Sequence, residues 1–240
     1  MARRVLWFDE VGSTNDVAVL LAERGESEGT VVAADTQTAG RGRLGRSWSS
    51  PIGAGVYFSV ILRPPTRVPL LTLAAGVAVA QGLQAATGLT PDLKWPNDVY
   101  VGNRKLAGIL AEGGTSKGSI PFVVLGIGIN VLAVTLPSEL ASRATSVEAE
   151  LGRSVERELV FAHVLVALAE RYGELCAGQS ARLHRAWRDR AGRMLDRTVE
   201  WDDRGTRRSG VARDIDQDGA LIVESASGTQ RIIAGEVTWR

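Results

Sequence analysis

The sequence predicts an α+β protein: a larger domain with a mixed β-sheet packed by helices, followed by a small β-barrel. Apolar runs of strand length alternate with amphipathic helical stretches over the first 190 or so residues. The last part instead has short strands separated by turn residues at close spacing. We therefore expect one domain over residues 1–192 and a second over residues 193–240.

The N-terminal part begins with a short strand at Val5–Phe8 and a helix whose first residues, Ser13–Asn15, could act as caps. A β-branched strand at Thr30–Asp35 leads into a glycine-arginine segment. A second strand, Gly55–Leu62, is stopped by two prolines. The glycine-arginine segment is therefore predicted to connect two sheet strands.

The middle of the chain predicts a long helix and a hairpin. The helix begins at Pro69 and runs to about Thr87. A strand at Leu93–Trp95, a turn at Pro96–Asp98 and a hairpin tip at Gly102–Asn103 follow. The return strand carries Lys105 and extends to Glu112, and 122–131 is apolar enough for a central strand.

Helices return after Thr145, where Thr145 and Glu148 have the spacing of a capping box. An apolar stripe from Val160 to Leu168 predicts a helix packed on the sheet, and an arginine-rich helix follows near 181–192. Short strands complete the chain near 198–201, 210–215, 220–224 and 231–233.

Composition excludes several classes of protein. The 240 residues carry a net charge of only +1, so an electrostatic function must be local. A single cysteine, Cys176, excludes an internal disulfide, and with no secretory signal or membrane-length apolar run we expect a cytoplasmic protein that makes no membrane contact. His163 and His184 lack partners at metal-ligand spacing.

The segment from Gly40 to Trp48 alternates three glycines with three arginines and contains no acidic residue. Glycines let backbone N–H groups approach a ligand, and guanidinium groups match phosphate and carboxylate oxygens. A solvated basic turn or an RNA contact is the alternative for the segment taken alone. One copy between two apolar strands of a nearly neutral chain favours a small anionic ligand.

Further blocks follow in a fixed order. Lys94–Val99 and Lys105–Glu112 flank the predicted hairpin tip, and Gly126–Asn130 lies in the next strand. Alone, each block could be ordinary packing or a solvent-directed lysine. Gly126 and Gly128 lack the third glycine and following helix of a dinucleotide fingerprint.

Together with Ser13–Asn15 and Gln37, the order and spacing of these blocks over about residues 10–131 resemble the biotin protein ligases. The resemblance implies a catalytic sheet of the class II synthetase, biotin/lipoate ligase type and a C-terminal SH3-like barrel. It also implies that biotin and ATP form biotinyl-5′-AMP, from which biotin passes to a lysine of a biotin carboxyl carrier domain. Mg²⁺ is expected with ATP.

The same resemblance assigns roles to residues. Lys105, Arg43 and Asp98 are implied as catalytic, with Asp98 either a proton acceptor or a partner of Lys105 or the metal. The glycine-arginine segment is expected to be mobile when empty and to close over the adenylate. The implied biotin-binding residues are Ser13, Thr14, Asn15, Gln37, Gly40, Arg41, Gly42, Arg43, Trp48, Lys105 and Gly108. The implied nucleotide-binding residues are Arg43, Arg46, Asn97, Lys105 and Asn130.

Alternatives remain open at this point. Lipoate-protein ligases share the architecture and the adenylate chemistry, but their glycine-rich and His-Asp signature is not visible. A non-catalytic RNA-binding module could use residues 182–213, which hold ten arginines against five acidic residues. Because Ser13 follows the N-terminus closely, we expect a short form without a DNA-binding domain. The pattern does not choose between a monomer and a weak homodimer, nor name the carboxylase whose carrier is modified.

Overall fold

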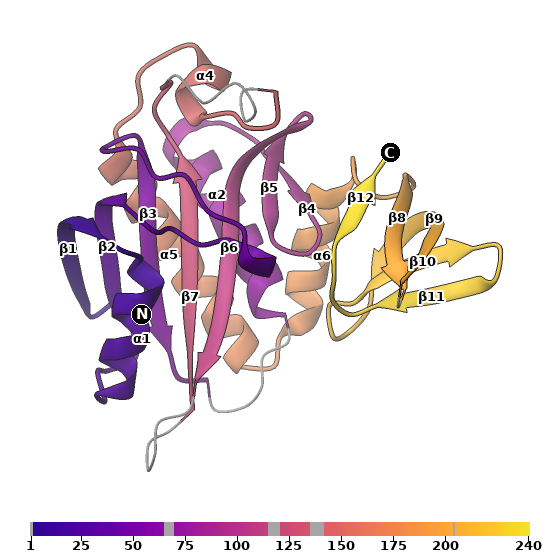
Figure 1. Cartoon of the computed structure of the whole chain (residues 1–240), viewed down its shortest axis with the longest axis horizontal. Coiled ribbons are helices and arrows are strands. Elements are labelled where there is room, and N and C mark those ends of the chain that lie inside the picture. Colours follow the sequence, from indigo (N-terminus) through magenta and orange to yellow (C-terminus); the bar gives the residue numbers. More distant parts are fainter. Residues whose placement is uncertain (1, 65–69, 115–120, 135–141, 204) are drawn as a thin grey trace.

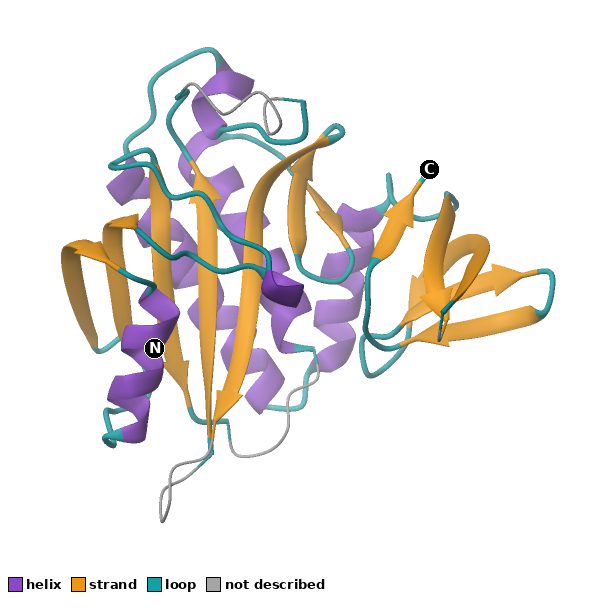
Figure 2. Cartoon of the chain, viewed as in Figure 1, coloured by secondary structure: helices purple, strands orange, loops and turns teal. Residues whose placement is uncertain are grey.

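The computed structural model describes residues 2–64, 70–114, 121–134, 142–203 and 205–240. A seven-stranded sheet with the order β1-β2-β3-β7-β6-β5-β4 forms the larger part of the molecule (Figures 1 and 2). Strands β1 and β2 are parallel and all other neighbours are antiparallel, so the sheet is mixed as predicted. Its strands are β1 Arg4–Val11, β2 Thr30–Gln37, β3 Gly55–Leu62, β4 Asp92–Lys94, β5 Asp98–Val101, β6 Arg104–Gly114 and β7 Phe122–Asn130.

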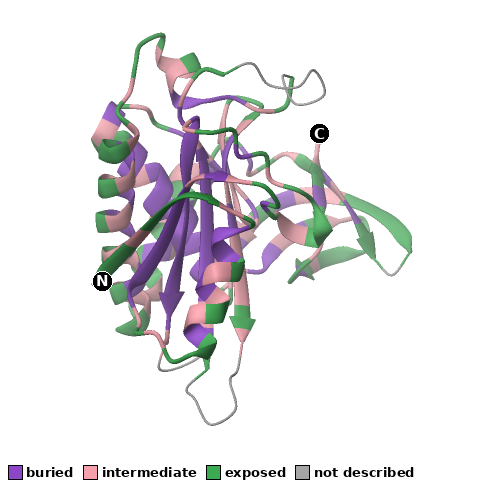
Figure 3. Ribbon diagram, turned by 60° about the vertical axis from the view of Figure 1, so that its left-hand side comes forward, coloured by how far each residue is buried: buried purple, intermediate pink, exposed green. Residues whose placement is uncertain are grey.

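Helices cover both faces of this sheet. Helix α1 (Thr14–Glu23) packs on one face, where Ala18 and Ala22 meet Ile61 and Val124. Helices α2 (Leu71–Thr87) and α5 (Arg157–Cys176) pack on each other and on the opposite face (Figure 1). Every residue of β3 is buried because helices lie on both sides of it (Figure 3). The position of α1 brings its N-terminus over the middle of the sheet.

The C-terminal strands form a separate five-stranded antiparallel sheet with the order β11-β10-β9-β8-β12, which confirms the predicted small SH3-like unit. Helix α6 (Ser180–Ala191) leads into it, and its Trp187 is buried in an apolar core shared with both sheets. Trp95 Nε1 also donates to Gly219 O at 2.8 Å. The strands are β8 Thr198–Asp203, β9 Thr206–Ile215, β10 Leu221–Ser225, β11 Gly228–Ile232 and β12 Val237–Trp239.

Two local expectations need correction. Thr145 does not cap α4 (Val147–Leu151); Ser146 does, accepting from Ala149 N–H, while Thr145 Oγ1 lies 2.5 Å from Glu150 Oε1. Strand β12 was absent from the prediction because its three residues give no periodicity. The helix start expected at 69 falls outside the described residues, and within them no helix is long and apolar enough to cross a membrane.

Candidate active site

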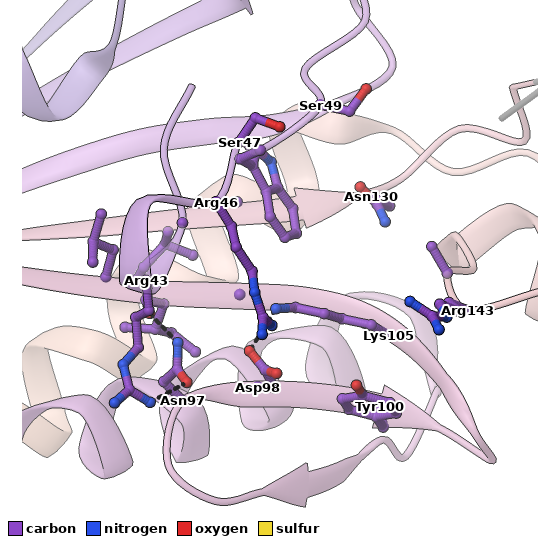
Figure 4. Close-up of a pocket in the computed structure, with 18 of the residues that line it drawn as sticks. Arg43, Arg46, Ser47, Ser49, Asn97, Asp98, Tyr100, Lys105, Asn130 and Arg143 are labelled. Atoms are coloured by element: carbon purple, nitrogen blue, oxygen red, sulfur yellow. Dashed lines mark hydrogen bonds and ion pairs between the residues drawn. The ribbon is translucent and has the colours of Figure 1, made fainter. Parts of the chain in front are cut away.

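A cavity of about 1110 Å³ lies where the glycine-arginine segment covers strands β5–β7, and it reaches the C-terminal strand β12. The α1 N-terminus borders one part of this cavity, and lysine and arginine side chains border another. Figure 4 shows Arg46 and Lys105 approaching Asp98 from different elements, and Arg43 beside the neighbouring Asn97. The elements that carry these side chains lie far apart in the sequence, so the fold assembles the site.

The α1 end of the cavity is a fixed set of neutral polar groups. Thr14 N–H donates to Gln37 Oε1 at 2.8 Å, and Thr14 Oγ1 lies 3.1 Å from the same oxygen. Gln37 Nε2 donates to Ser50 Oγ at 2.9 Å, which fixes the orientation of the Gln37 amide. Ser13 occupies the N-cap position of α1 without a side-chain capping bond, so the capping alternative is not realised. These groups present both donors and acceptors to a ligand.

Asn15 and Ser59 continue this polar set into the protein. Asn15 Nδ2 donates to Glu112 Oε2 at 2.6 Å, and Asn15 Oδ1 lies 2.5 Å from Ser59 Oγ. Gly126 faces Asn15 from strand β7, where an added Cβ would stand 2.2 Å from Asn15 Oδ1. The glycine at this position therefore makes room for the Asn15 side chain.

Arg41 connects the glycine-arginine segment to α1 and to strand β6 of the seven-stranded sheet. Its guanidinium pairs with Asp16 and donates to Glu112 at 2.8 Å, and the Asp16 hydrogen bond raises the pKa of Arg41. An isolated β-bridge joins Arg41 to Ser47, and between them Leu44 has a positive φ of 56°. The charge of Arg41 is thus largely committed to carboxylates of the chain itself.

Trp48 lies on a surface that lacks side chains. An added Cβ at Gly128 would stand 2.5 Å from Trp48 Nε1, and one at Gly108 would stand 2.9 Å from Trp48 Cζ3. Lys105 Nζ lies 5.4 Å from the centre of the Trp48 ring, a cation–π distance. Two glycines, one from β6 and one from β7, therefore let the indole form an apolar wall beside a cation.

Lys105 and Asp98 form an ion pair on neighbouring strands, with Nζ 2.6 Å from Oδ1. Asp98 pairs with Gly108 across β5 and β6, so the hairpin brings the two charged side chains to one face. Both side chains are mostly buried, at 29% and 21% exposure, which strengthens their attraction relative to a surface pair. The described arrangement places a lysine ammonium at the cavity wall.

Arg43 enters the cavity beside this pair and is held from two sides. Its Nη1 donates to Asn97 Oδ1 at 3.1 Å, and its Nη2 lies 3.5 Å from Gly235 O. Asn97 Nδ2 in turn donates to Ile109 O at 2.6 Å, so the amide orientation is fixed. Burial lowers the pKa of Arg43, because desolvation disfavours the charged guanidinium, and a bound anion would offset that cost.

The C-terminal sheet contributes an anion to the same cavity. Glu236 pairs with Arg46, and this contact lowers the pKa of Glu236 and raises the pKa of Arg46. Lys94 Nζ lies 4.9 Å from the centre of the Tyr100 ring, and burial lowers the pKa of Lys94. Burial also raises the pKa of Tyr100 to about 12, so its hydroxyl stays protonated near neutral pH.

The structure brings the predicted residues together with one exception. Gly40 does not line the cavity: it is buried at the start of the segment, where an added Cβ would stand 2.6 Å from Trp48 O. Asn130 lines it and donates to Thr145 O at 3.0 Å. The other predicted residues that line it are Ser13, Thr14, Asn15, Gln37, Arg41, Gly42, Arg43, Arg46, Trp48, Asn97, Asp98, Lys105 and Gly108.

Several lining residues were not predicted. Tyr100 follows the Lys94–Val99 block directly, so its place on β5 was available from the sequence. Arg143 and Glu236 lie in segments with no recognisable motif, and only the fold brings them to the cavity (Figure 4 for Arg143). Main-chain bonds from Lys105 N–H to Arg143 O (2.7 Å) and Thr145 N–H to Lys105 O (2.9 Å) place the Arg143 segment.

Metal-binding capacity is limited in this cavity. The described residues contain no cluster of three or more His, Cys, Asp or Glu side chains that could hold a metal ion. Asp98 and Glu236 are carboxylates on the cavity wall. Such a donor set fits a Mg²⁺ that keeps most of its ligands as phosphate and water oxygens, and it does not fit a metal held by protein alone.

Two family models match the chain. The biotin/lipoate A/B protein ligase family matches residues 7–130, and the biotin protein ligase C-terminal domain matches residues 198–239. The first match contains the polar groups at the α1 end, the glycine-arginine segment and the Lys105–Asp98 pair. The second contains Glu236.

Curated proteins and solved structures agree with these matches. The chain is 36% identical to the biotin–[acetyl-CoA-carboxylase] ligase of Paracoccus denitrificans, with 94% of this chain and 96% of that protein covered. It is 37% identical to the bifunctional ligase/repressor BirA of Bacillus subtilis, covering 99% of this chain and 74% of that protein. The structure of Aquifex aeolicus biotin protein ligase in complex with biotin and ATP matches with a TM-score of 0.82, 31% identity and 99% of each chain.

Proposed function

The chain belongs to the biotin/lipoate A/B protein ligase family, and we propose that it is an ATP-dependent biotin protein ligase. In this proposal it activates biotin with ATP to biotinyl-5′-AMP and then transfers biotin to a lysine of a biotin carboxyl carrier domain. The relatives named as biotin–[acetyl-CoA-carboxylase] ligases and the neighbour solved with biotin and ATP support this reaction.

One observation supports the proposal more than any other: a single cavity has two chemically different ends. Thr14 and Gln37 lie at the neutral end, where acceptors and donors can meet the two N–H groups and the carbonyl of the biotin ureido ring. Unpaired, those groups would be costly to bury. At the other end Arg43, Arg46 and Lys105 suit a carboxylate and a polyphosphate. The volume of about 1110 Å³ has room for both substrates.

In the first step a carboxylate oxygen of biotin attacks the α-phosphorus of ATP, and pyrophosphate leaves. The approaching groups are both anionic, so fixed cations lower the barrier. Lys105 beside Trp48 is assigned to the biotin carboxylate and the α-phosphate, and Arg43 to the adenylate. Their positions are set before substrate arrives, Lys105 by Asp98 and Arg43 by Asn97.

In the second step the lysine nitrogen of the carrier attacks the acyl carbon, the bond to AMP breaks and the attacking nitrogen loses a proton. Asp98 is the carboxylate nearest to Lys105, and its 2.6 Å ion pair supports a role in orienting that lysine. Its role as proton acceptor stays a prediction. The glycine-arginine segment covers the cavity, and a covered mixed anhydride is protected from water.

Mg²⁺ is part of the proposal only as a companion of ATP. When bound with the nucleotide it would offset phosphate charge, with Asp98 and Glu236 as the carboxylates within reach. We also propose residues 193–240 as a distinct C-terminal domain that completes the nucleotide end through Gly235 and Glu236.

The test is to incubate the protein with ATP, Mg²⁺ and an isolated biotin carboxyl carrier domain, with biotin in one reaction and lipoate in another, and to weigh the carrier by mass spectrometry. We expect the mass of one biotinyl group only when biotin and ATP are both present. Modification by lipoate alone would replace this proposal with the lipoate ligase alternative, and no modification of any carrier would reject both.

The RNA-binding alternative has little physical support in the fold. The arginines of residues 182–213 lie within 4.0 Å of carboxylates at several positions, so much of their charge is compensated locally. The pairs are Arg182 with Glu174, Arg188 with Asp214, Arg193 with Asp92, Arg207 with Glu200, Arg208 with Asp203 and Arg213 with both Asp196 and Glu224.

A further inference from the structure

We infer that Ser59, a residue outside the cavity, is a positioning residue that fixes Thr14 Oγ1 as a hydrogen-bond acceptor toward the ligand. The inference rests on the proposed function and concerns how the same site recognises the ureido ring. Ser59 lies within β3, where all the other residues except Tyr57 lack polar side-chain atoms, and none of its surface is exposed. It lies on the face of β3 that carries Ile61 and is covered by α1.

The contacts of Ser59 can be assigned by counting protons. Its Oγ lies 2.5 Å from Asn15 Oδ1 and 2.8 Å from Thr14 Oγ1, but a serine hydroxyl has a single proton. Asn15 Nδ2 donates to the Glu112 carboxylate at 2.6 Å, which turns Asn15 Oδ1, an acceptor only, toward Ser59. At 2.5 Å this pair of oxygens needs a proton between them, and Ser59 is the residue that supplies it.

The assignment determines the proton of Thr14. With its own proton on Asn15, Ser59 Oγ can only accept, so the 2.8 Å contact requires the Thr14 hydroxyl to donate to Ser59. The donors then run in one direction, from Thr14 through Ser59 and Asn15 to the negative charge of Glu112, and each bond polarises the next. Arg41 holds the Glu112 carboxylate in place at the far end.

The consequence for the ligand is chemical selectivity. Gln37 Oε1 is a second acceptor, 3.1 Å from Thr14 Oγ1, but it already accepts from Thr14 N–H at 2.8 Å, and the shorter contact to Ser59 takes the single Thr14 proton. With that proton directed into the sheet, Oγ1 has a lone pair left for the cavity. The site therefore favours an N–H group at this point over an ether oxygen of the same size. Gly126 is required by the same chain of hydrogen bonds, because any side chain there would displace Asn15.

The experiment compares three proteins and three ligands by titration calorimetry. The proteins are the wild type, Ser59→Ala and Ser59→Cys, in which a thiol of similar size has only weak donor and acceptor ability. The ligands are biotin and two cyclic carbamates, in each of which one ureido N–H is replaced by oxygen. Ser59→Cys keeps the volume filled if the alanine variant packs poorly.

In the wild type we expect one carbamate to bind at least tenfold more weakly than biotin. In both variants we expect biotin affinity to fall about tenfold and the biotin-to-carbamate ratio to fall below threefold, because Thr14 can then turn its proton toward an ether oxygen. Equal weakening of both ligands, with an unchanged ratio, would overturn the inference while leaving the proposed function intact. Wild type that binds no biotin would overturn both.

Discussion

At the scale of single residues, the most specific prediction concerns the loss of activity when Lys105 is replaced. It is the lysine of the cavity that is joined both to a carboxylate, Asp98, and to an indole, Trp48. Lys105→Ala would remove the cation that we propose for the forming phosphate charge, and it would take away the lysine partner of Asp98. We predict that Lys105→Ala lowers the rate of biotin-dependent exchange of pyrophosphate into ATP by about 10²-fold or more.

The exchange assay measures the first step alone, so no carrier is needed. Arg182→Ala is the control, since Arg182 is exposed and pairs at 3.8 Å with Glu174, remote from the cavity. Circular dichroism of both variants checks the fold. Exchange at the normal rate in Lys105→Ala would remove Lys105 from the reaction.

For Arg43 we expect a different defect, the premature release of the biotinyl-AMP intermediate. Its guanidinium ties the glycine-arginine segment to Asn97 and to Gly235, and its charge is assigned to the adenylate. We predict that Arg43→Gly releases biotinyl-AMP into solution, detected by chromatography of the filtrate, at least tenfold faster than the wild type. Leu44→Gly is the matched control, because it adds a glycine at a position of positive φ and leaves the guanidinium in place. Equal retention by both variants would reject the clamp role of Arg43.

At the scale of elements, the strand glycines determine where side chains of the site can lie. An alanine Cβ at Gly126 of β7 would stand 2.2 Å from Asn15 Oδ1, so Asn15 must leave its contacts with Ser59 and Glu112. We predict that Gly126→Ala raises the KM for biotin at least tenfold and lowers the free energy of unfolding by about 1–3 kcal/mol. The KM for ATP should change little.

Gly113 of β6 provides the matched control for that substitution. A Cβ added at Gly113 would lie 4.0 Å from Phe122 O, which is an ordinary van der Waals distance. Alanine therefore fits at this position. We expect Gly113→Ala to keep the wild-type KM for biotin. A Gly126→Ala variant with the same KM as Gly113→Ala would show that the position of Asn15 is unimportant for binding.

The sequence was a good guide to the elements and to part of the site. Apolar runs predicted β3 and β7, and the hairpin tip at Gly102 correctly placed Lys105 opposite the Asp98 strand. The fold class and family were confirmed. Neither Ser59 nor Glu236 could be predicted, since one polar residue in an apolar strand, or one acidic residue near the end of the chain, has no periodicity or motif. Their contacts arise only from tertiary packing.

The same limit explains the expectation about the glycine-arginine segment. Sequence alone showed three guanidinium groups without acidic neighbours and predicted that all would serve an anion. The fold supplies carboxylates from elsewhere: Asp16 and Glu112 hold Arg41, and Glu236 holds Arg46. Two arginines are thus paired within the chain. Arg43, whose described contacts are to an amide and a carbonyl, is left as the arginine with uncompensated charge at close range.

At the scale of the whole molecule, the Arg46–Glu236 pair connects the C-terminal sheet to the segment that covers the catalytic cavity. The hydrogen bond from Arg46 lowers the pKa of the Glu236 carboxylate, which is therefore ionised at neutral pH. Because this pKa is lowered, the ion pair contributes its full stabilisation of the closed segment at every pH above the ordinary glutamate pKa of about 4.3. The stabilisation is lost only as the pH falls through the lowered pKa. We predict that Glu236→Gln opens the segment more often.

Trypsin cleavage after Arg43 and Arg46 measures this opening, because a protease reaches the segment in proportion to its open population. An exposed pair of this kind contributes about 0.5–1 kcal/mol, which corresponds to a two- to fivefold faster cleavage in Glu236→Gln. The ratio of variant to wild type should be equal at pH 7 and pH 8.5, since Glu236 stays ionised throughout. Glu224→Gln is the control, because it removes a carboxylate that pairs with Arg213 within the C-terminal sheet. We expect trypsin to cleave this variant at the wild-type rate. Equal rates for all three proteins would mean that the C-terminal sheet does not restrain the segment.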